Sequence, residues 1–131
     1  MSEAQRKSEE EWRQLLTADQ YHVCRQGGTE RAFTGEYWDC KNDGIYRCVC
    51  CRNKLFSSET KFDSGTGWPS FHTPLALDRV TESEDVAMGM RRVEIRCGAC
   101  DAHLGHVFDD GPEPAGKRYC MNSVALSLDS E

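Results

Sequence analysis

The sequence predicts a mainly β, antiparallel fold with short N-terminal helices, and three observations carry this prediction. Helix-capping pairs and helical spacing of apolar residues occur before Gly28. Beyond Gly35, apolar and polar residues alternate in short runs that Gly, Pro and Asp interrupt, as antiparallel strands and their turns require. Two Cys-x-x-Cys pairs, separated by residues 52–96, offer a metal site that ties distant strands together.

Size and charge limit the classes of function. A chain of 131 residues fits one domain, and its 22 acidic against 16 basic residues give a net charge of -6 that would repel nucleic acid. No run of roughly 20 apolar residues is present to cross a membrane, and the first residues lack the apolar stretch of a secretory signal. We therefore expect a cytoplasmic protein, or one of an organelle lumen if a transit peptide precedes this sequence, with no nucleic-acid or membrane partner.

The N-terminus is expected to be a mobile tail over residues 1–8, which are polar and charged, followed by one domain over residues 9–131. Ser8 and Glu11 have the spacing of a capping box, which predicts a helix. Its apolar stripe consists of Trp12, Leu15 and Leu16. A second short helix follows the same kind of pair, Thr17 with Gln20, carries Tyr21 and Val23, and ends at Gly27 and Gly28.

Strands are predicted where alternation with period two meets turn residues. The turn Asn42-Asp43 precedes the first of them, and loops rich in Gly, Pro and Asp separate the others. The predicted strands are residues 44–48, 90–97, 118–121 and 124–128.

The two Cys-x-x-Cys pairs are predicted to hold one structural zinc ion. Each pair follows a predicted strand, and a leucine lies four residues beyond each, at Leu55 and Leu104. Zinc takes four thiolates tetrahedrally and then has no open position for a substrate, so the chemistry must lie elsewhere. The predicted ligands are Cys48, Cys51, Cys97 and Cys100.

Two disulfides or four unrelated core cysteines are the alternatives to zinc, and neither fits paired Cys-x-x-Cys motifs in a reducing compartment as well. Cys50 lies only two residues after Cys48, a poor spacing for joint chelation, so it is expected to be a bystander.

Cys120 is the candidate nucleophile among the other cysteines. On a strand, Arg118 and Asn122 share its face because side chains alternate with period two. A nearby cation lowers the pKa of a thiol and enriches the thiolate, which is the attacking form. We therefore expect an ionised, reactive Cys120.

His103 and His106 follow the second cysteine pair and are candidate proton donors, because an unperturbed imidazole titrates near pH ~6.5. The alternative is that one histidine caps a turn and the other packs in the core. Trp68 and Phe71 lie in a loop shaped by two glycines and a proline, and they either form a binding surface or fill the core.

Together these motifs resemble the B-class peptide methionine (R)-S-oxide reductases. The similarity covers nearly the whole chain, through GTERAFTGEYW, GIYRCVCC, KFDSGTGWPSFH, RRVEIRCGACDAHLGHVFDDGP and GKRYCMNSVAL, in the family's order. It implies two antiparallel sheets, structural zinc on the four cysteines and a catalytic Cys120. It matches His103, His106 and Asn122 to active-site polar residues, Trp68 to the wall that receives the substrate's methyl group, and Arg118 and Asp110 to supporting polar positions. Phe71 is expected on the substrate-binding side as well.

The resemblance implies reduction of methionine (R)-sulfoxide, mainly in proteins. The Cys120 thiolate would attack the sulfoxide sulfur while His103 or His106 protonates its oxygen and Asn122 orients that oxygen. Methionine departs and leaves a sulfenic acid on Cys120.

Recycling is expected to differ from that of many family members. Where they carry a resolving cysteine before the tryptophan, this chain has Thr66. Cys24 or Cys40 could supply the second thiol, or thioredoxin or glutathione with glutaredoxin could reset Cys120 directly.

Two alternative hypotheses remain. A non-catalytic zinc-knuckle module could bind a protein partner through Trp68, but Cys120 and the histidine pair would then have no role. A thiol oxidoreductase would need the Cys-x-x-Cys pairs that the zinc site already uses. We expect a monomeric enzyme whose partners are oxidised proteins and a thioredoxin or glutaredoxin-type reductant.

Overall fold

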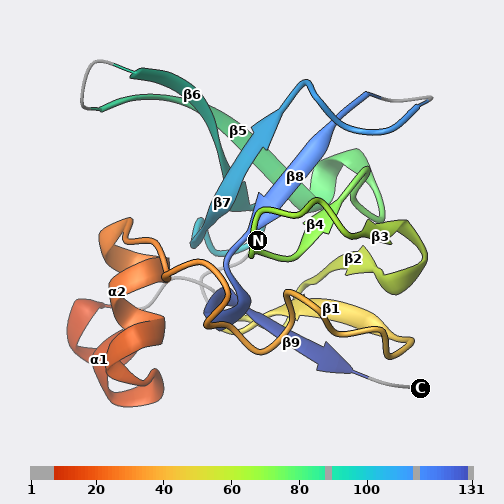
Figure 1. Ribbon diagram of the computed structural model, residues 1–131. Helices are drawn as coiled ribbons and strands as arrows, with labels where there is room; N and C mark the ends of the chain where they lie inside the picture. The colour runs from red at the N-terminus through yellow and green to blue at the C-terminus, as the bar shows by residue number, and fades with distance from the viewer. Residues whose placement is uncertain (1–7, 88–89, 114–115, 130–131) are drawn as a thin grey trace.

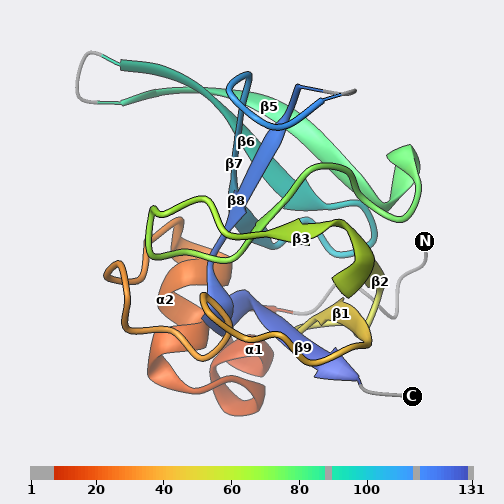
Figure 2. The same cartoon turned by 45° about the vertical axis from the view of Figure 1, so that its right-hand side comes forward.

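The computed structural model describes residues 8–87, 90–113 and 116–129 (Figure 1). Two helices lie beside two antiparallel sheets, and the β5–β6 hairpin extends beyond the rest of the molecule (Figures 1 and 2). One sheet has the strand order β2-β1-β9 and the other the order β3-β4-β8-β7-β6-β5. The predicted mainly β fold with two antiparallel sheets and short N-terminal helices is confirmed.

The elements have the following bounds: α1 Glu9–Leu15, α2 Ala18–Gln26, β1 Ile45–Cys48, β2 Lys54–Ser57, β3 Lys61–Phe62, β4 Ser70–Phe71, β5 Val80–Ala87, β6 Met90–Cys97, β7 His103–Phe108, β8 Arg118–Met121 and β9 Leu126–Asp129. All four predicted strands are present, as β1, β6, β8 and β9. The last begins later than predicted because residues 123–125 form a short 3-10 helix. Among the described residues, no helix is long and apolar enough to cross a membrane.

Both predicted capping boxes are present. Ser8 begins α1 and Thr17 begins α2, each exchanging hydrogen bonds with the residue three positions on. Gly27 ends α2 with φ at 72°, the left-handed conformation that glycine adopts without strain. Leu15 departs from the predicted stripe and is 61% exposed, because only Trp12 of α1 is buried in the core. Except for its final residue, the predicted N-terminal tail lies outside the described residues.

The core fills the space between the two sheets. Tyr46 of β1, Phe56 of β2 and Phe71 of β4 are all fully buried, and the rings of Phe56 and Phe71 stack with centroids 4.4 Å apart. Phe71 pairs with Tyr119 across β4 and β8, while Ser70 pairs with Cys120. Because strand side chains alternate, Phe71 and Tyr119 enter the core and Cys120 lies on the opposite face of the six-stranded sheet.

Candidate active site and metal centre

A small cavity of about 90 Å³ lies on the Cys120 face of the sheet. Cys120, His106, Asn122 and Trp68 all line it, so the structure brings together four of the side chains that the sequence singled out. The remaining residues that line the cavity are Thr29, Arg92, Gly105, Phe108 and Met121.

The register between β7 and β8 places His106 next to Cys120. These two residues are direct cross-strand partners, which puts their Cβ atoms about 5 Å apart on one face. Gly105, the neighbour of His106, faces the main chain of Cys120 so closely that a Cβ atom there would collide with its carbonyl group. The absence of a side chain at Gly105 therefore lets the two strands approach.

Burial controls the Cys120 thiol. Burial raises its pKa and outweighs the hydroxyl of Thr66, the guanidinium of Arg118 and the hydroxyl of Ser70, which all lower it. Arg118 thus lowers the pKa of the Cys120 thiol, as predicted. The expectation of an ionised thiol in the resting protein is nevertheless wrong, because burial raises that pKa overall. The thiol keeps its proton near neutral pH, so any reaction at Cys120 must move that proton.

Arg118 is held by two partners. Its guanidinium donates to both carboxylate oxygens of Asp110, at 2.8 and 3.2 Å, and lies over the Phe108 ring at 4.4 Å. The same guanidinium holds the pKa of Asp110 below its usual range. This two-point contact fixes the cation beside Cys120.

The two histidines have different surroundings. His106 lines the cavity, and its Nε2 lies 2.8 Å from Asp85 Oδ2. His103 does not line it: its side chain is 7% exposed, and its Nδ1 lies 2.6 Å from Glu94 Oε2. Burial lowers the pKa of His103 and outweighs Glu94, which raises it. His106 is therefore the histidine that a ligand in this cavity meets.

Glu30, which no spacing pattern in the sequence marks, positions two walls of the cavity. Its main-chain N–H donates to Asn122 Oδ1 at 2.9 Å, and its carbonyl oxygen accepts from Trp68 Nε1 at 3.0 Å. Its carboxylate also accepts from the main-chain N–H of Val124 at 3.0 Å. The only sequence signal for Glu30 was its place in the string GTERAFTGEYW.

A second centre is formed by the four predicted metal ligands. The sulfur atoms of Cys48, Cys51, Cys97 and Cys100 all lie within 4.8 Å of one another. Two of the pairs, Cys48 with Cys100 and Cys51 with Cys97, are 3.7 and 3.6 Å apart. A tetrahedron of thiolates at about 2.3 Å from zinc has edges of roughly 3.8 Å, so this donor set fits zinc. Cys50 is not part of the group.

Neighbouring donors support the four sulfur atoms. Asn53 Nδ2 donates to Cys97 Sγ at 3.5 Å, and so does the main-chain N–H of Ala99 at 3.4 Å. From α2, Arg25 donates to the carbonyl oxygen of Cys100 at 2.9 Å and to its sulfur at 3.7 Å. Such donors stabilise thiolates, the form in which cysteine binds metal.

Comparisons with known proteins identify the family of this chain. The SelR domain family matches residues 16–130. This chain belongs to that family. It is 62% identical over 121 residues to "Peptide methionine sulfoxide reductase B1, chloroplastic" of Oryza sativa subsp. japonica, covering 92% of this chain and 56% of that protein. It is 58% identical over 125 residues to "Peptide methionine sulfoxide reductase MsrB" of Hahella chejuensis, covering 95% of this chain and 90% of that protein.

A chloroplastic relative from Arabidopsis thaliana, also named peptide methionine sulfoxide reductase B1, is 58% identical over 123 residues, covering 94% of this chain and 61% of that protein. The chain therefore spans between a half and two thirds of the length of these two plant relatives and most of the bacterial one. The predicted membership in the B-class methionine sulfoxide reductases, a family of oxidoreductases, is confirmed.

Three residues expected at the SelR site lie elsewhere. Phe71 is fully buried and lies on the opposite face of the sheet. Of the two roles considered for it, a binding surface or core packing, it therefore has the second. Cys24, on α2, is 3% exposed and interacts with Cys50 beside the metal centre. Neither residue lines the cavity of Cys120.

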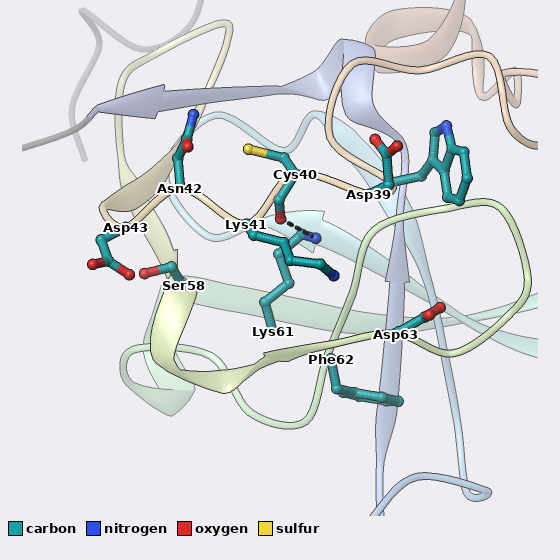
Figure 3. A pocket seen from close by; sticks show the side chains of 10 residues that line it. Asp39, Cys40, Lys41, Asn42, Asp43, Ser58, Lys61, Phe62 and Asp63 are labelled. Carbon is teal, nitrogen blue, oxygen red and sulfur yellow. Dashed lines mark hydrogen bonds between the residues drawn. The ribbon is translucent and has the colours of Figure 1, made fainter.

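Cys40 lines a separate cavity of about 280 Å³, shown in Figure 3. Its carbonyl oxygen accepts a 2.8 Å hydrogen bond from Lys61 Nζ. Its thiol interacts with the hydroxyl of Tyr46, which belongs to the core. This cavity shares no lining residue with that of Cys120, so Cys40 and Cys120 line different cavities.

Proposed function

We propose that this protein reduces methionine (R)-sulfoxide, mainly within proteins, to methionine, with Cys120 as the nucleophile. The observation that carries the proposal is a single cavity in which a thiol, an imidazole, an amide and an indole converge. The names of the matched relatives support the same reaction.

Two walls and the mouth of the cavity would together select between the two sulfoxide epimers. The indole of Trp68 offers an apolar surface to the substrate's methyl group, while His106 and Asn122 offer polar contacts to its oxygen. The rest of the substrate must then leave through the mouth of the cavity. With the positions of methyl, oxygen and chain all assigned, only one hand of the sulfoxide places its sulfur against Cys120.

The reaction transfers the sulfoxide oxygen to the Cys120 sulfur and needs the thiol proton to balance. A bond forms between the Cys120 sulfur and oxygen, the sulfur–oxygen bond of the sulfoxide breaks, and the thiol proton ends on the sulfenic acid. Cys120 is oxidised by two electrons and the substrate sulfur is reduced by two. His106, which lines the cavity, would take the thiol proton and deliver it to the sulfoxide oxygen as charge develops there. His103, outside the cavity, is assigned a supporting role.

The cycle closes with an external thiol. No cysteine other than Cys120 lines its cavity, and the hydroxyl of Thr66 interacts with the thiol at the place where a resolving cysteine is expected. A sulfenic acid there would react with a thiol of thioredoxin, or of glutathione followed by glutaredoxin, to form a mixed disulfide and water. A second thiol would then release Cys120.

We further propose that residues 9–131 act as one monomeric domain with one structural zinc ion at the four-cysteine centre. Bound zinc would hold the turn after β1 to the turn after β6. The eight cysteines form no disulfide, which supports a reducing compartment such as the cytoplasm or, as for the plant relatives, an organelle.

Epimer-resolved turnover tests the proposal. Dithiothreitol-driven reduction of N-acetyl-methionine amide (R)- and (S)-sulfoxide is measured for the wild type and for Cys120→Ser and His106→Gln, together with zinc content. We expect turnover of the R epimer alone, abolished by Cys120→Ser and slowed about 100-fold or more by His106→Gln. A zinc-knuckle module would contain zinc but show no turnover, and turnover by Cys120→Ser would refute the assigned nucleophile.

A further inference from the structure

Asp85 of β5 holds the imidazole that faces Cys120. Its Oδ2 lies 2.8 Å from His106 Nε2, and the two side chains are 27% and 10% exposed. His106 Nδ1 makes no hydrogen bond to any residue that the structure describes. Because Nε2 is engaged by the carboxylate, Nδ1 is the ring nitrogen left to meet a ligand in the cavity.

We propose that Asp85 is a positioning residue for proton transfer between Cys120 and the sulfoxide oxygen, and that Arg92 moderates its effect. The inference rests on the proposed function and gives roles to two residues for which the sequence predicted none. Asp85 accepts Nε2–H, so the neutral imidazole presents its lone pair at Nδ1. That nitrogen takes the thiol proton and returns it to the sulfoxide oxygen, with no net gain or loss of protons.

The charge of Asp85 acts on the intermediate state. When Nδ1 holds the thiol proton, His106 is an imidazolium, and the adjacent carboxylate stabilises that cation. The hydrogen bond to His106 is the main reason why the pKa of Asp85 lies below its usual range, so the carboxylate is ionised at neutral pH. Without the Asp85 carboxylate, the imidazole of His106 could rotate or adopt the other tautomer. In that tautomer Nδ1 is already protonated and cannot accept the thiol proton.

Arg92 competes for the same carboxylate oxygen. It pairs with Asp85 across β5 and β6, and its Nη2 lies 3.3 Å from Oδ2. Its side chain lines the cavity of Cys120, which places a cation near His106. A cation at that distance disfavours a protonated imidazole, so Arg92 opposes Asp85.

The other charged groups around His106 have partners of their own. They are Glu94 of β6, His103 of β7, and Arg118 and Cys120 of β8. Glu94 accepts from His103 and forms an ion pair with Arg96, and Arg118 is bound by Asp110. Asp85 is therefore the carboxylate whose removal changes the proton affinity of His106 most directly.

Single-turnover kinetics test the proposal. The protein is mixed with N-acetyl-methionine-(R)-sulfoxide amide between pH 5 and 9, and the first equivalent of methionine product is followed. Asp85→Asn should lower the maximal rate at neutral pH about tenfold or more with little change in the substrate concentration for half-saturation. The acid limb of its pH profile should move to lower pH, because the reacting imidazole is neutral and its protonated form has lost the stabilising anion. Arg92→Gln should move the same limb to higher pH, and Asp85→Glu should restore much of the rate.

Glu84→Gln is the matched control. Glu84 adjoins Asp85 on β5 but points to the opposite face, where it pairs with Arg91 at 2.8 Å. This variant removes a carboxylate from the same hairpin and should leave rate and pH profile unchanged. If the hairpin had a purely structural role, Glu84→Gln and Asp85→Asn would change the rate and the pH profile alike.

Imidazole nitrogen NMR gives a readout that does not depend on turnover. His106 should be the Nε2–H tautomer in the wild type and in Glu84→Gln, and a mixture of tautomers in Asp85→Asn. Superimposable tautomer signals and pH profiles for wild type and Asp85→Asn would overturn the inference. If His106→Gln itself reacts at the wild-type rate, the proposed proton donor is wrong. If His106→Gln is slow and Asp85→Asn is normal, the inference on Asp85 alone fails.

Discussion

The side-chain oxygen of Asn122 accepts a 2.9 Å hydrogen bond from the main-chain N–H of Glu30. The carbonyl group of Glu30 accepts from Trp68 Nε1 on the other side of the cavity. A single residue of the loop after α2 thus sets the distance between the polar wall and the apolar wall. Because both contacts use the main chain of Glu30, the loop's path matters more than the side chain at that position.

The first prediction concerns the indole N–H of Trp68. Trp68→Phe keeps an aromatic wall but removes the hydrogen bond to Glu30, so the ring should no longer be fixed against the substrate's methyl group. We expect kcat/KM for the R sulfoxide to fall about fivefold, which corresponds to the roughly 1 kcal/mol of one hydrogen bond, mainly through a higher KM. Trp38→Phe is the control, since Trp38 lies outside the cavity of Cys120. Equal losses in both variants would contradict the assignment.

The second prediction separates Cys51 from its neighbour Cys50. Cys51→Ser should lose bound zinc and lower the free energy of unfolding by several kcal/mol, because metal binding couples to folding. Cys50→Ser should keep zinc and fold stability, since Cys50 does not belong to the four-sulfur group. Metal analysis and thermal unfolding, with and without a chelator, measure both effects. Zinc loss from Cys50→Ser would show that the ligand set is misassigned.

The third prediction concerns the fate of the sulfenic acid. One turnover without reductant should leave a sulfenic acid on Cys120 that a dimedone-type reagent traps, and no internal disulfide should form. The double variant Cys24→Ser/Cys40→Ser should react and recycle like the wild type, because neither thiol lines the cavity. Thr66→Cys should convert the trapped acid into a disulfide with Cys120. Peptide mass analysis reads all three results, and a Cys120 link to Cys24 or Cys40 would refute the one-cysteine cycle.

Features encoded by local spacing could be predicted from the sequence. The capping boxes at Ser8 and Thr17 depend on residues three positions apart, and each Cys-x-x-Cys pair is a local turn. The strands β1, β6, β8 and β9 were predicted from alternation and are all present, and burial alternates along β1 and β8. The strand β5 was not predicted from alternation, because it is an edge strand with polar residues over most of its length. In β7 the first five residues are all buried, so its sequence does not alternate either.

The cavity was only partly predictable for a similar reason. Cys120, His106 and Asn122 belong to two neighbouring strands whose motifs were visible. Asp85 reaches His106 because β5 and β6 fold back as a long hairpin, and no spacing rule reveals that contact. The assignment of Phe71 to the substrate failed because one position along the strand changes the face of the sheet.

The last prediction concerns acid stability and His103. Burial lowers the pKa of this histidine in the folded state below the roughly 6.5 of an unfolded chain. The unfolded state therefore binds a proton first, and the stabilisation present above pH ~6.5 is lost as the pH falls towards the folded-state pKa. The slope of this loss can reach about 1.4 kcal/mol per pH unit for one proton.

His103→Gln removes the titrating group, so its free energy of unfolding should change less between pH 7 and 5 than that of the wild type, whatever its value at pH 7. Urea unfolding at several pH values measures both slopes. His22→Gln, at an exposed position on α2, should keep the wild-type slope. If the wild type and His103→Gln lose stability in parallel over this range, the buried imidazole is not the group that responds to acid.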